Sequence, residues 1–222
     1  MNTLLLRLSG AMQSWGIQSD FTDRDTGLEP SKSGVLGLVC AAMGIDREND
    51  ATLAELAVLK MGVRIDRRGW VKTDYHMAGK SGFLRSDGNI ERKDLIPSRR
   101  KYLSDALFLV GLESADLKLL ERIHAALKNP VRPLFLGRKA FVPGEPVWLE
   151  DGLKPGLELE QALTTYRYLS ERAAPERLRL VLEDLNGATV RSDQPLSFAP
   201  GNRRFAPRRI TVTFIEMHKE AA

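Results

Sequence analysis

The residues whose types and spacing most clearly suggest a binding site are Lys32, Ser33 and Gly34, which lie directly before the apolar segment 35–43. The first turn of a helix leaves backbone N–H groups unpaired and carries a partial positive charge, and glycine lets a phosphate approach that backbone closely. This pattern predicts a phosphate site to which Lys32 adds a full charge. The spacing is not that of a Walker A loop. An ordinary serine cap, with glycine for tight helix packing, is the open alternative.

A large aromatic residue, Trp15, and the polar Gln13 follow the first predicted strand, residues 3–9. RNA-recognition sheets carry base-stacking side chains at such strand ends and in the adjoining loops. Both residues are therefore candidates for contact with RNA. The competing interpretation is that Trp15 anchors the core.

Two further segments place basic residues next to a predicted strand or turn. Guanidinium groups bind phosphate in a bidentate manner and stack on bases, so these residues would hold a nucleic-acid backbone if they face one side. A solvated surface of locally paired charges is the other interpretation. The candidates are Arg99, Arg100, Lys101 and Tyr102 in one segment, and Arg138 and Lys139 in the other.

One histidine, His76, adjoins a tyrosine, Tyr75, within a basic segment. Histidine can act as a general acid or base, which keeps open the alternative function of a metal-independent endoribonuclease. A single histidine without a clear partner is more often structural, so we assign no catalytic residue. The one cysteine, Cys40, can form neither an internal disulfide nor a cysteine cluster for zinc, which fits a cytoplasmic protein. We expect no metal and no cofactor.

The 222-residue chain has a formal net charge of +4, but its charges are unevenly distributed. Residues 64–101 hold eleven cations and five anions, an excess larger than that of the whole chain. Such a distribution is typical of a surface that follows phosphates. Within it, residues 74–101 show no sustained period and few aliphatic side chains, which indicates a functional or disordered insertion.

The order of the predicted elements favours an α+β fold with an RNA-recognition or ferredoxin-like sheet. Periodicity predicts strands at 3–9, 62–66, 70–73, 102–112, 178–182 and 210–217, and helices at 35–43, 51–60 and 116–128. Asn186-Gly187 is a hairpin signal between the last two strands. No apolar run approaches the roughly 20 residues of a membrane span, so we expect no membrane partner.

Five short motifs carry a resemblance to a known family. They are L-x-L-x-G-x-M-Q-S-W-G at 6–16, P-S-K-S-G-V-L-G-L at 30–38, D-Y-H at 74–76, R-K-Y-L-S-D-A at 100–106 and L-G-R-K at 136–139. In this order they resemble the CasD subunits of type I-E CRISPR Cascade complexes, which belong to the RAMP superfamily. The resemblance covers residues 1–140 and extends more loosely to the C-terminal strands.

The resemblance implies a ferredoxin-like palm with an inserted basic thumb and C-terminal β strands. The palm would comprise residues 1–73 and 102–222, and its part from residue 155 onward is a candidate β subdomain. The thumb would comprise residues 74–101. Its candidate contact residues are His76, Lys80 and Arg85.

The resemblance also implies a function in antiviral defence. The chain would hold the repeat-derived 5′ handle of the CRISPR RNA without cutting it, and would cap the CasC backbone of the complex. Its other protein partner would be the large subunit CasA. Target DNA would be met indirectly, because guide pairing reads the sequence while the protein holds shape and backbone.

Overall fold

The structure, a computed structural model, describes residues 1–18, 22–79, 82–84, 87–91 and 95–216. Its helices are α1 (Lys32–Met43), α2 (Asp50–Ala57), α3 (Leu117–Lys128) and α4 (Leu159–Thr165). Its strands are β1 (Asn2–Gln13), β2 (Asp23–Arg24), β3 (Lys60–Arg67), β4 (Trp70–Ala78), β5 (Phe83–Leu84), β6 (Ile90–Glu91), β7 (Ile96–Ser114), β8 (Trp148–Lys154), β9 (Arg177–Glu183), β10 (Thr189–Ser197) and β11 (Arg204–Glu216). Within these residues, no helix combines the length and apolarity that crossing a membrane requires.

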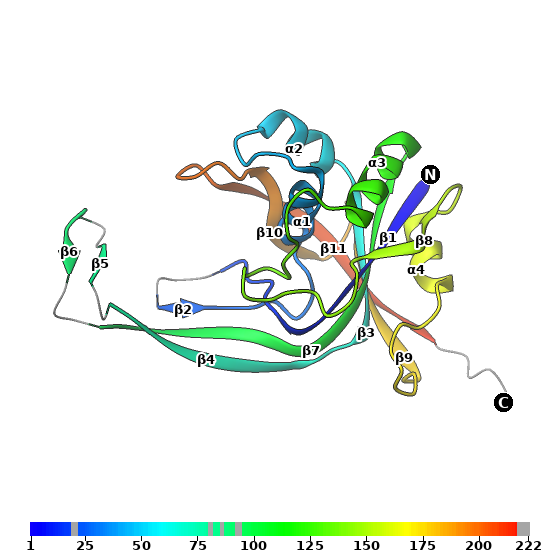
Figure 1. Cartoon of the computed structure of the whole chain (residues 1–222). Coiled ribbons are helices and arrows are strands. Elements are labelled where there is room, and N and C mark those ends of the chain that lie inside the picture. Colours follow the sequence, from blue (N-terminus) through cyan, green and yellow to red (C-terminus); the bar gives the residue numbers. More distant parts are fainter. Residues whose placement is uncertain (19–21, 80–81, 85–86, 92–94, 217–222) are drawn as a thin grey trace.

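Nine strands form one largely antiparallel sheet (Figure 1). Its order is β10-β11-β9-β3-β7-β1-β8, and β2 and β4 also pair with β7. Four of these strands, β3-β7-β1-β8, are neighbours in the sheet, and α1 and α3 lie in the connections that follow β1 and β7. The predicted α+β class is confirmed in that the fold is mixed and dominated by antiparallel sheet.

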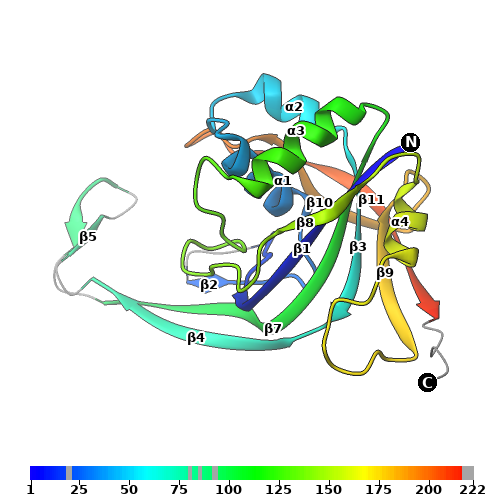
Figure 2. The ribbon, with the colours of Figure 1, turned by 45° about the vertical axis from the view of Figure 1, so that its right-hand side comes forward.

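The central strands carry apolar side chains on both faces, because successive residues of a strand point to opposite sides. On β1, Leu4 and Leu6 belong to the larger core cluster, to which α1, α2 and α3 also contribute. Leu5 points to the other face, where it packs with Leu109 and Leu163 in a smaller cluster beneath α4. Figure 2 shows α4 apart from the other three helices. The sheet is therefore the middle layer of the body.

Local sequence signals explain where the helices begin and end. Ser31 caps α1, and Gly44 ends it with a φ of 72°, a left-handed conformation that suits glycine. The Asp116 carboxylate caps α3 by accepting from Leu119 N at 3.1 Å. Both helices were predicted, and the structure adds one turn to the start of α1.

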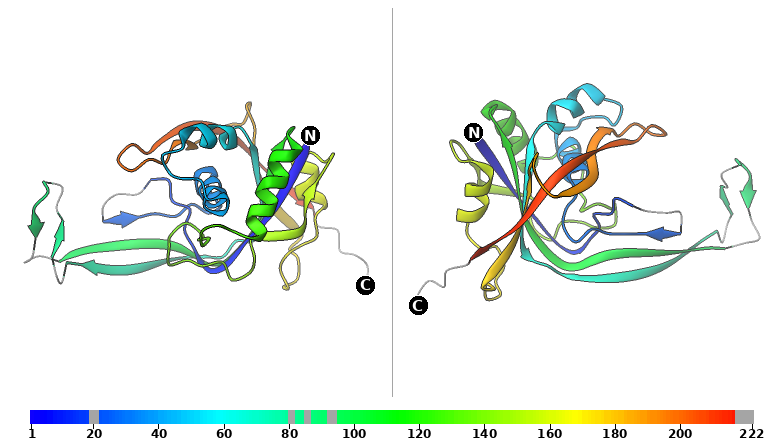
Figure 3. Two further views of the ribbon diagram at one scale, coloured as in Figure 1. Left: turned by 45° about the horizontal axis from the view of Figure 1, so that its top comes forward. Right: turned by 180° about the vertical axis from the view of Figure 1, so that it is seen from behind.

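The β4 and β7 strands continue beyond the body as a long arm (Figures 1 and 3). Trp70 lies opposite Ser104, and the pairing continues without a break until Ala78 lies opposite Ile96. The short strand β2 pairs with β7 on its other side. Strands β5 and β6 pair with each other at the tip.

Periodicity predicted only the first part of this arm, a strand over 70–73, and treated residues 74–101 as irregular. The structure instead has strand through Ala78 and again from Ile96. The reason is physical: every residue of β4 is exposed. A strand with no buried face has no alternation of polar and apolar residues for periodicity to detect.

The C-terminal strands also depart from the prediction. Asn186-Gly187 lies in the turn between β9 and β10, yet these two strands do not pair with each other. Instead β11 pairs with both of them: its first half lies beside β10 and its second half beside β9, with Ile210 at the crossing point. The two predicted strands on either side of this turn, 178–182 and 210–217, do pair with each other as β9 and β11; the prediction missed β10, which follows the turn directly and pairs with the first half of β11.

Candidate nucleic-acid interface

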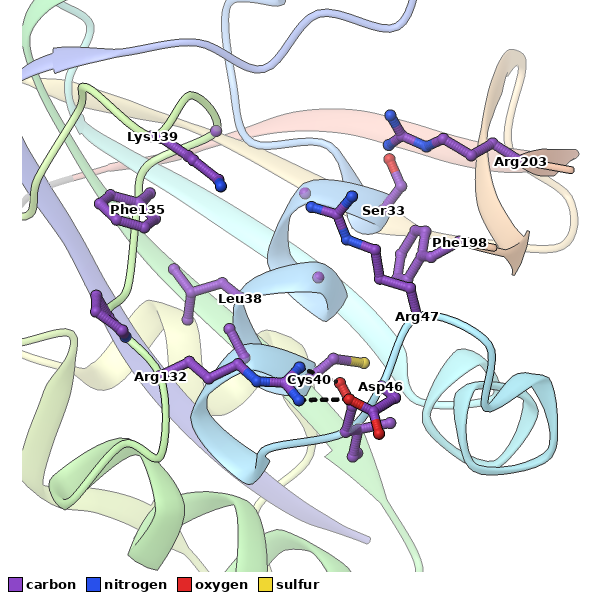
Figure 4. A pocket seen from close by; sticks show the side chains of 16 residues that line it. Ser33, Leu38, Cys40, Asp46, Arg47, Arg132, Phe135, Lys139, Phe198 and Arg203 are labelled. Atoms are coloured by element: carbon purple, nitrogen blue, oxygen red, sulfur yellow. Dashed lines mark hydrogen bonds and ion pairs between the residues drawn. The ribbon is translucent and has the colours of Figure 1, made fainter. Parts of the chain in front are cut away.

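A groove of about 540 Å³ runs along the open side of α1. Its floor is made of small and apolar α1 residues, which are Ser33, Gly34, Gly37, Leu38 and Ala41. Its walls come from the loop after α1, the loop between α3 and β8, and the turn between β10 and β11 (Figure 4). Three segments that are distant in the sequence therefore meet over one helix.

Four cations line this groove: Arg47, Arg132, Lys139 and Arg203. Figure 4 shows Arg47, Lys139 and Arg203 reaching from different segments toward the start of α1. Of the described lining residues, Asp46 is the one carboxylate, and it accepts from Arg132 Nη2 at 2.5 Å. The groove is thus strongly positive, and its guanidinium groups are the kind that bind phosphate.

Two phenylalanines, Phe135 and Phe198, also line the groove. Phe198 lies across the floor, since a Cβ added to Gly37 would be 3.9 Å from Phe198 Cζ. Its ring also packs on Phe205, with 6.5 Å between ring centroids. Cations that follow a backbone and aromatic rings that accept bases are the two ingredients of single-strand binding.

The helix α1 begins among the residues that the sequence indicated, but its first glycine has a structural reason. Ser31 Oγ accepts from Gly34 N at 3.3 Å, which is an ordinary serine cap. A Cβ on Gly34 would lie 2.9 Å from Trp15 Cε3, so close packing of the indole requires this glycine. Ser33 lies on the groove side of the helix. The alternative interpretation therefore accounts for Gly34, and Ser33 keeps access to a ligand.

Lys32 was predicted as a phosphate contact, and the structure places its side chain in the interior, with 1% exposure. Its Nζ donates to both carboxylate oxygens of Glu183, at 3.0 and 2.9 Å. Its backbone N donates to Asp193 Oδ2 at 2.8 Å. Burial lowers the pKa of this ammonium, and the neighbouring Glu183 partly opposes that shift. The Lys32 ammonium is therefore paired with a carboxylate in the interior of the protein.

Trp15 and Gln13, predicted as candidates for contact with RNA, are likewise buried, at 2% and 0% exposure. Trp15 Nε1 donates to Gln13 Oε1 at 3.1 Å, and Gln13 Nε2 donates to Ala106 O at 2.8 Å. The pair joins the loop after β1 to β7. This placement favours the interpretation of Trp15 as a core anchor.

The predicted pair Arg138 and Lys139 splits between two surfaces. Lys139 lines the groove. Arg138 turns away from the groove, donates to Arg24 O at 3.3 Å, and lies with its guanidinium carbon 5.6 Å from the centre of the Phe141 ring. Burial first, and then the charges of Arg100 and Arg24, lower the pKa of Arg138.

The loop that carries this pair is held by backbone contacts. Leu136 N donates to Phe141 O at 2.7 Å, and Leu136 O accepts from Ser14 N at 3.0 Å. Gly137 has a φ of 95°, and a Cβ there would lie 1.8 Å from Ser14 O. The loop can therefore approach β1 closely only because residue 137 is glycine.

The predicted basic run in β7 divides between the two faces of the arm, because neighbours in a strand point to opposite sides. Arg99 and Lys101 are exposed and lie opposite Tyr75 and Thr73. Arg100 and Tyr102 are half-buried on the other face. Arg100 Nε donates to Ser98 Oγ at 3.1 Å, and the Tyr102 ring packs on Phe141 with centroids 5.8 Å apart. The four residues therefore lie on two opposite faces of the arm and do not form one patch.

The histidine and tyrosine singled out for chemistry lie on β4. Both are exposed, and they are adjacent in an extended strand, so their side chains point to opposite faces. His76 Nε2 forms a very short contact with Asp74 Oδ2. The geometry does not bring His76 and Tyr75 to a common site. Of the other predicted thumb residues, Lys80 and Arg85 lie outside the described residues.

Sequence reasoning missed several of the residues that form the groove. Arg132 and Arg203 line the groove and are not among the residues predicted from the sequence to contact RNA. Nothing in the spacing of Arg47, Phe135 or Phe198 pointed to this groove, because each reaches it through the tertiary fold.

The described residues contain no group of three or more metal-binding side chains of the His, Cys, Asp and Glu types. Cys40 is a buried free thiol. Its burial raises its pKa to about 11, so the thiol form dominates near neutral pH.

Comparisons with known proteins place these features in a wider context. A family model described as CRISPR-associated protein (Cas_Cas5) matches residues 3–211. The CRISPR system Cascade subunit CasD of Escherichia coli strain K12 is 31% identical over 199 residues, which cover 82% of this chain and 87% of that protein.

Two solved structures have similar folds. One, described as a Cas protein, has a TM-score of 0.77 and 44% identity, over 96% of this chain and 95% of the other. The second, described as a CRISPR RNA-guided surveillance complex, contains a chain with a TM-score of 0.77 and 35% identity, over 96% of this chain and 90% of the other.

Proposed function

The chain belongs to the Cas5 family of CRISPR-associated proteins, and we propose that it is a CRISPR-RNA-binding subunit of a Cascade surveillance complex. The observation that carries this proposal is the groove over α1, where four cations and two phenylalanines surround a floor of small residues. The likeness to CasD and to a chain of a CRISPR RNA-guided surveillance complex supports the same function.

We propose that the ligand is the single-stranded 5′ handle of the CRISPR RNA. Arg47, Arg132, Lys139 and Arg203 would contact its phosphates, and Phe135 and Phe198 would pack on its bases. Phosphate contacts position a nucleic acid, while base contacts specify it. The groove therefore supplies groups for both phosphate and base contacts. Ser33, in the first turn of α1, would add a hydroxyl.

We further propose that the body is an elaborated ferredoxin-like palm and the β4–β7 arm is its thumb. The order β3-β7-β1-β8, with helices after β1 and β7, supports the palm. The thumb would contact RNA and the CasC-like backbone, and the large subunit would be a second protein partner. Target DNA would be reached through guide pairing. The free thiol of Cys40 fits assembly in the reducing cytoplasm.

We propose that the chain binds its RNA without cutting it. The candidate groups for metal-independent cleavage, His76 and Tyr75, point to opposite faces of one strand. Purified protein incubated with its repeat RNA in the presence of a chelator should leave the RNA intact on a denaturing gel. Cleavage that disappears in His76→Ala would identify the chain as the nuclease.

The groove is tested by the salt dependence of handle binding. A fluorescent handle oligonucleotide is titrated with the protein, by anisotropy, over roughly 50–300 mM salt. The slope of log affinity against log salt measures the number of phosphates neutralised, at about 0.7 per contact for single strands. Each of Arg47→Gln, Lys139→Gln and Arg203→Gln should weaken binding and flatten this slope by about that amount.

The matched control is Arg122→Gln, which removes an exposed arginine of α3 that does not line the groove. It should leave both affinity and slope unchanged. The same variants are then tested in the assembled complex, by the yield of guide RNA that co-purifies with the other subunits. Equal slopes for the wild type and a triple groove variant would show that the handle binds elsewhere.

A further inference from the structure

The outer edge of β4 is an unpaired strand edge. In the arm, β7 lies between β2 and β4, so β4 pairs on one side only among the described residues. All nine residues of β4 are exposed. Figure 1 shows β4 on the outside of the arm, with no other element beside it, and the rear view in Figure 3 agrees.

Such an edge presents a row of free backbone N–H and C=O groups, which other strands can pair with. Natural proteins protect edges with charged side chains, proline, bulges or very short strands. This strand carries Lys72 and Asp74, whose effect on pairing depends on the residues that lie opposite them. This strand is long, contains no proline, and pairs with β7 without a register shift. Its exposed face also carries large apolar groups: Val71, Tyr75 and Met77 are 51%, 60% and 57% exposed. The edge is therefore suited to receiving another strand.

We infer that the occupant of this edge is β4 of a second copy of the chain, paired antiparallel about a two-fold axis at Thr73. A two-fold axis perpendicular to the sheet must pass through a residue, because residues i and i+1 point to opposite faces and cannot lie opposite each other. Four positions near the middle of the strand can serve as the centre: Lys72, Thr73, Asp74 and Tyr75.

Only one of these centres gives both Lys72 and Asp74 a countercharge. With the axis at Thr73, Lys72 of each copy lies opposite Asp74 of the other. The contact of Asp74 with His76 leaves room for this pair, since a carboxylate has about four acceptor positions. The same register places Val71 opposite Tyr75, and Trp70 opposite His76. Opposite charges and aromatic–β-branched neighbours are both favourable cross-strand pairs.

The other centres are worse for stated reasons. An axis at Lys72 places two lysines opposite each other, and an axis at Asp74 does the same with two carboxylates. Like charges directly opposite each other destabilise a sheet. An axis at Tyr75 places Asp74 opposite His76 but leaves Lys72 opposite Ala78, without a countercharge. The sequence of β4 is therefore self-complementary in one register.

This pairing would join two arms into one continuous sheet, in the order β2-β7-β4-β4-β7-β2. It concerns the free subunit and goes beyond the proposed RNA-binding function. A contact through one nine-residue strand per chain is small beside standard stable interfaces, which involve about 20–30 residues a side. We therefore expect a reversible dimer that forms as the protein concentration rises.

A charge-swap series tests the register. Sedimentation equilibrium or light scattering is measured over a concentration series for the wild type, Lys72→Asp and Asp74→Lys. Each single change places like charges opposite each other twice per dimer and should weaken self-association by roughly tenfold. The double variant Lys72→Asp/Asp74→Lys restores both pairs and should restore the dimer. A mixture of the two single variants should form heterodimers.

The matched control is Lys101→Asp on β7, which makes the same charge change opposite Thr73 but on the inner strand. It should leave the dimer unchanged. Circular dichroism and a thermal melt of each variant show that the chain remains folded, so that loss of the dimer reports on the edge.

Disulfide trapping tests the axis directly. With Thr73→Cys, each introduced thiol lies opposite its counterpart across a pair with Cβ atoms about 4.5–5.5 Å apart, and mild oxidation should give a covalent dimer. With Tyr75→Cys, the thiol lies opposite Val71 of the second copy and should give none. Cys40 is buried and common to both variants.

Three results would overturn the inference. The wild type could remain monomeric at every concentration. The dimer could resist both single charge changes. Trapping could be equal for Thr73→Cys and Tyr75→Cys. If the free chain is monomeric and Thr73→Cys instead crosslinks to another subunit in the assembled complex, the edge belongs to that subunit and the self-pairing is rejected.

Discussion

At the scale of single residues, the interior of this protein holds charged side chains in closed networks. Arg64 is fully buried, and its guanidinium donates to Asp66 Oδ1 at 2.7 Å and to Asp66 Oδ2 at 2.8 Å. The same group donates to the carbonyl oxygens of Leu163 and Tyr166, at 2.7 and 2.5 Å. These bonds fasten the end of α4 to β3. The network satisfies a charge that would be costly to bury alone.

Removing one partner of that network should be severely destabilising. Asp66→Asn leaves the buried guanidinium without its countercharge, and we expect a loss of about 3–5 kcal/mol in the free energy of unfolding. Urea unfolding measures it. The control is Arg177→Gln, which breaks a pair whose side chains are 67% and 59% exposed and should cost under about 1 kcal/mol. Similar midpoints for the two variants would contradict this account.

Sequence reasoning located local features around the candidate residues but could not show where their side chains lie. The small residues around Lys32 correctly indicated a helix start, and Lys139 was correctly placed next to a turn. The sequence could not show that the Lys32 ammonium meets Glu183, because the two are 151 positions apart. Whether a lysine faces solvent or a distant carboxylate is decided by packing. Local spacing carries no information about it.

At the scale of elements, the groove depends on one tight turn. The loop between α3 and β8 reaches β1 only because Gly137 has no side chain. Gly137→Ala would place a Cβ 1.8 Å from Ser14 O at a φ of 95°, so the backbone must move and carry Lys139 with it. We expect a cost of at least about 2 kcal/mol, together with weaker handle binding in the anisotropy assay.

The comparison for that turn is Gly156→Ala. Gly156 also has a positive φ, of 76°, but no heavy atom lies within 4 Å of the added Cβ. This variant should lose only about 1–2 kcal/mol, from backbone strain, and should keep its RNA affinity. If both variants lost the same amount of RNA affinity, the Gly137 turn would not be what positions the groove.

The elements themselves were largely predictable where they have a buried face. Residues 116–128 read as an amphipathic helix, and α3 is one, with Leu120, Ile123 and Leu127 buried. The pairing of the C-terminal strands was not predictable, because both β9 and β10 pair with β11. A turn signal such as Asn186-Gly187 specifies a local bend, and strand partners are chosen by the whole sheet.

At the scale of the whole molecule, the body and the arm differ in what holds them together. Among the described residues, neither core cluster includes a side chain between Asp66 and Tyr102; Tyr102 itself packs against the larger cluster from its edge. The arm is therefore supported by backbone pairing and the body by apolar burial. Sequence periodicity did not detect most of the arm, because a strand without a buried face shows no alternation of polar and apolar residues.

The body should remain stable without the outer arm. Replacing residues 77–97 by Asn-Gly would join His76 to Ser98, which lie opposite each other, through a two-residue hairpin turn that Ser98 N can close by donating to His76 O. No core contact is lost, so the melting temperature should change by less than about 4 °C. Differential scanning calorimetry measures the change. A fall of more than about 10 °C would show that the arm contributes to the stability of the body.

The tie between the start of α1 and the C-terminal strands has a consequence for timing during synthesis. The Lys32 side chain and backbone N–H pair with Glu183 and Asp193, which are synthesised much later than α1. Arg203, which lines the groove, is synthesised later still. Chains emerge and fold from their N-terminus, so α1 is made early but anchored late. A nascent or prematurely released chain consequently lacks a finished groove, and we expect unfinished copies to bind handle RNA more weakly than complete ones.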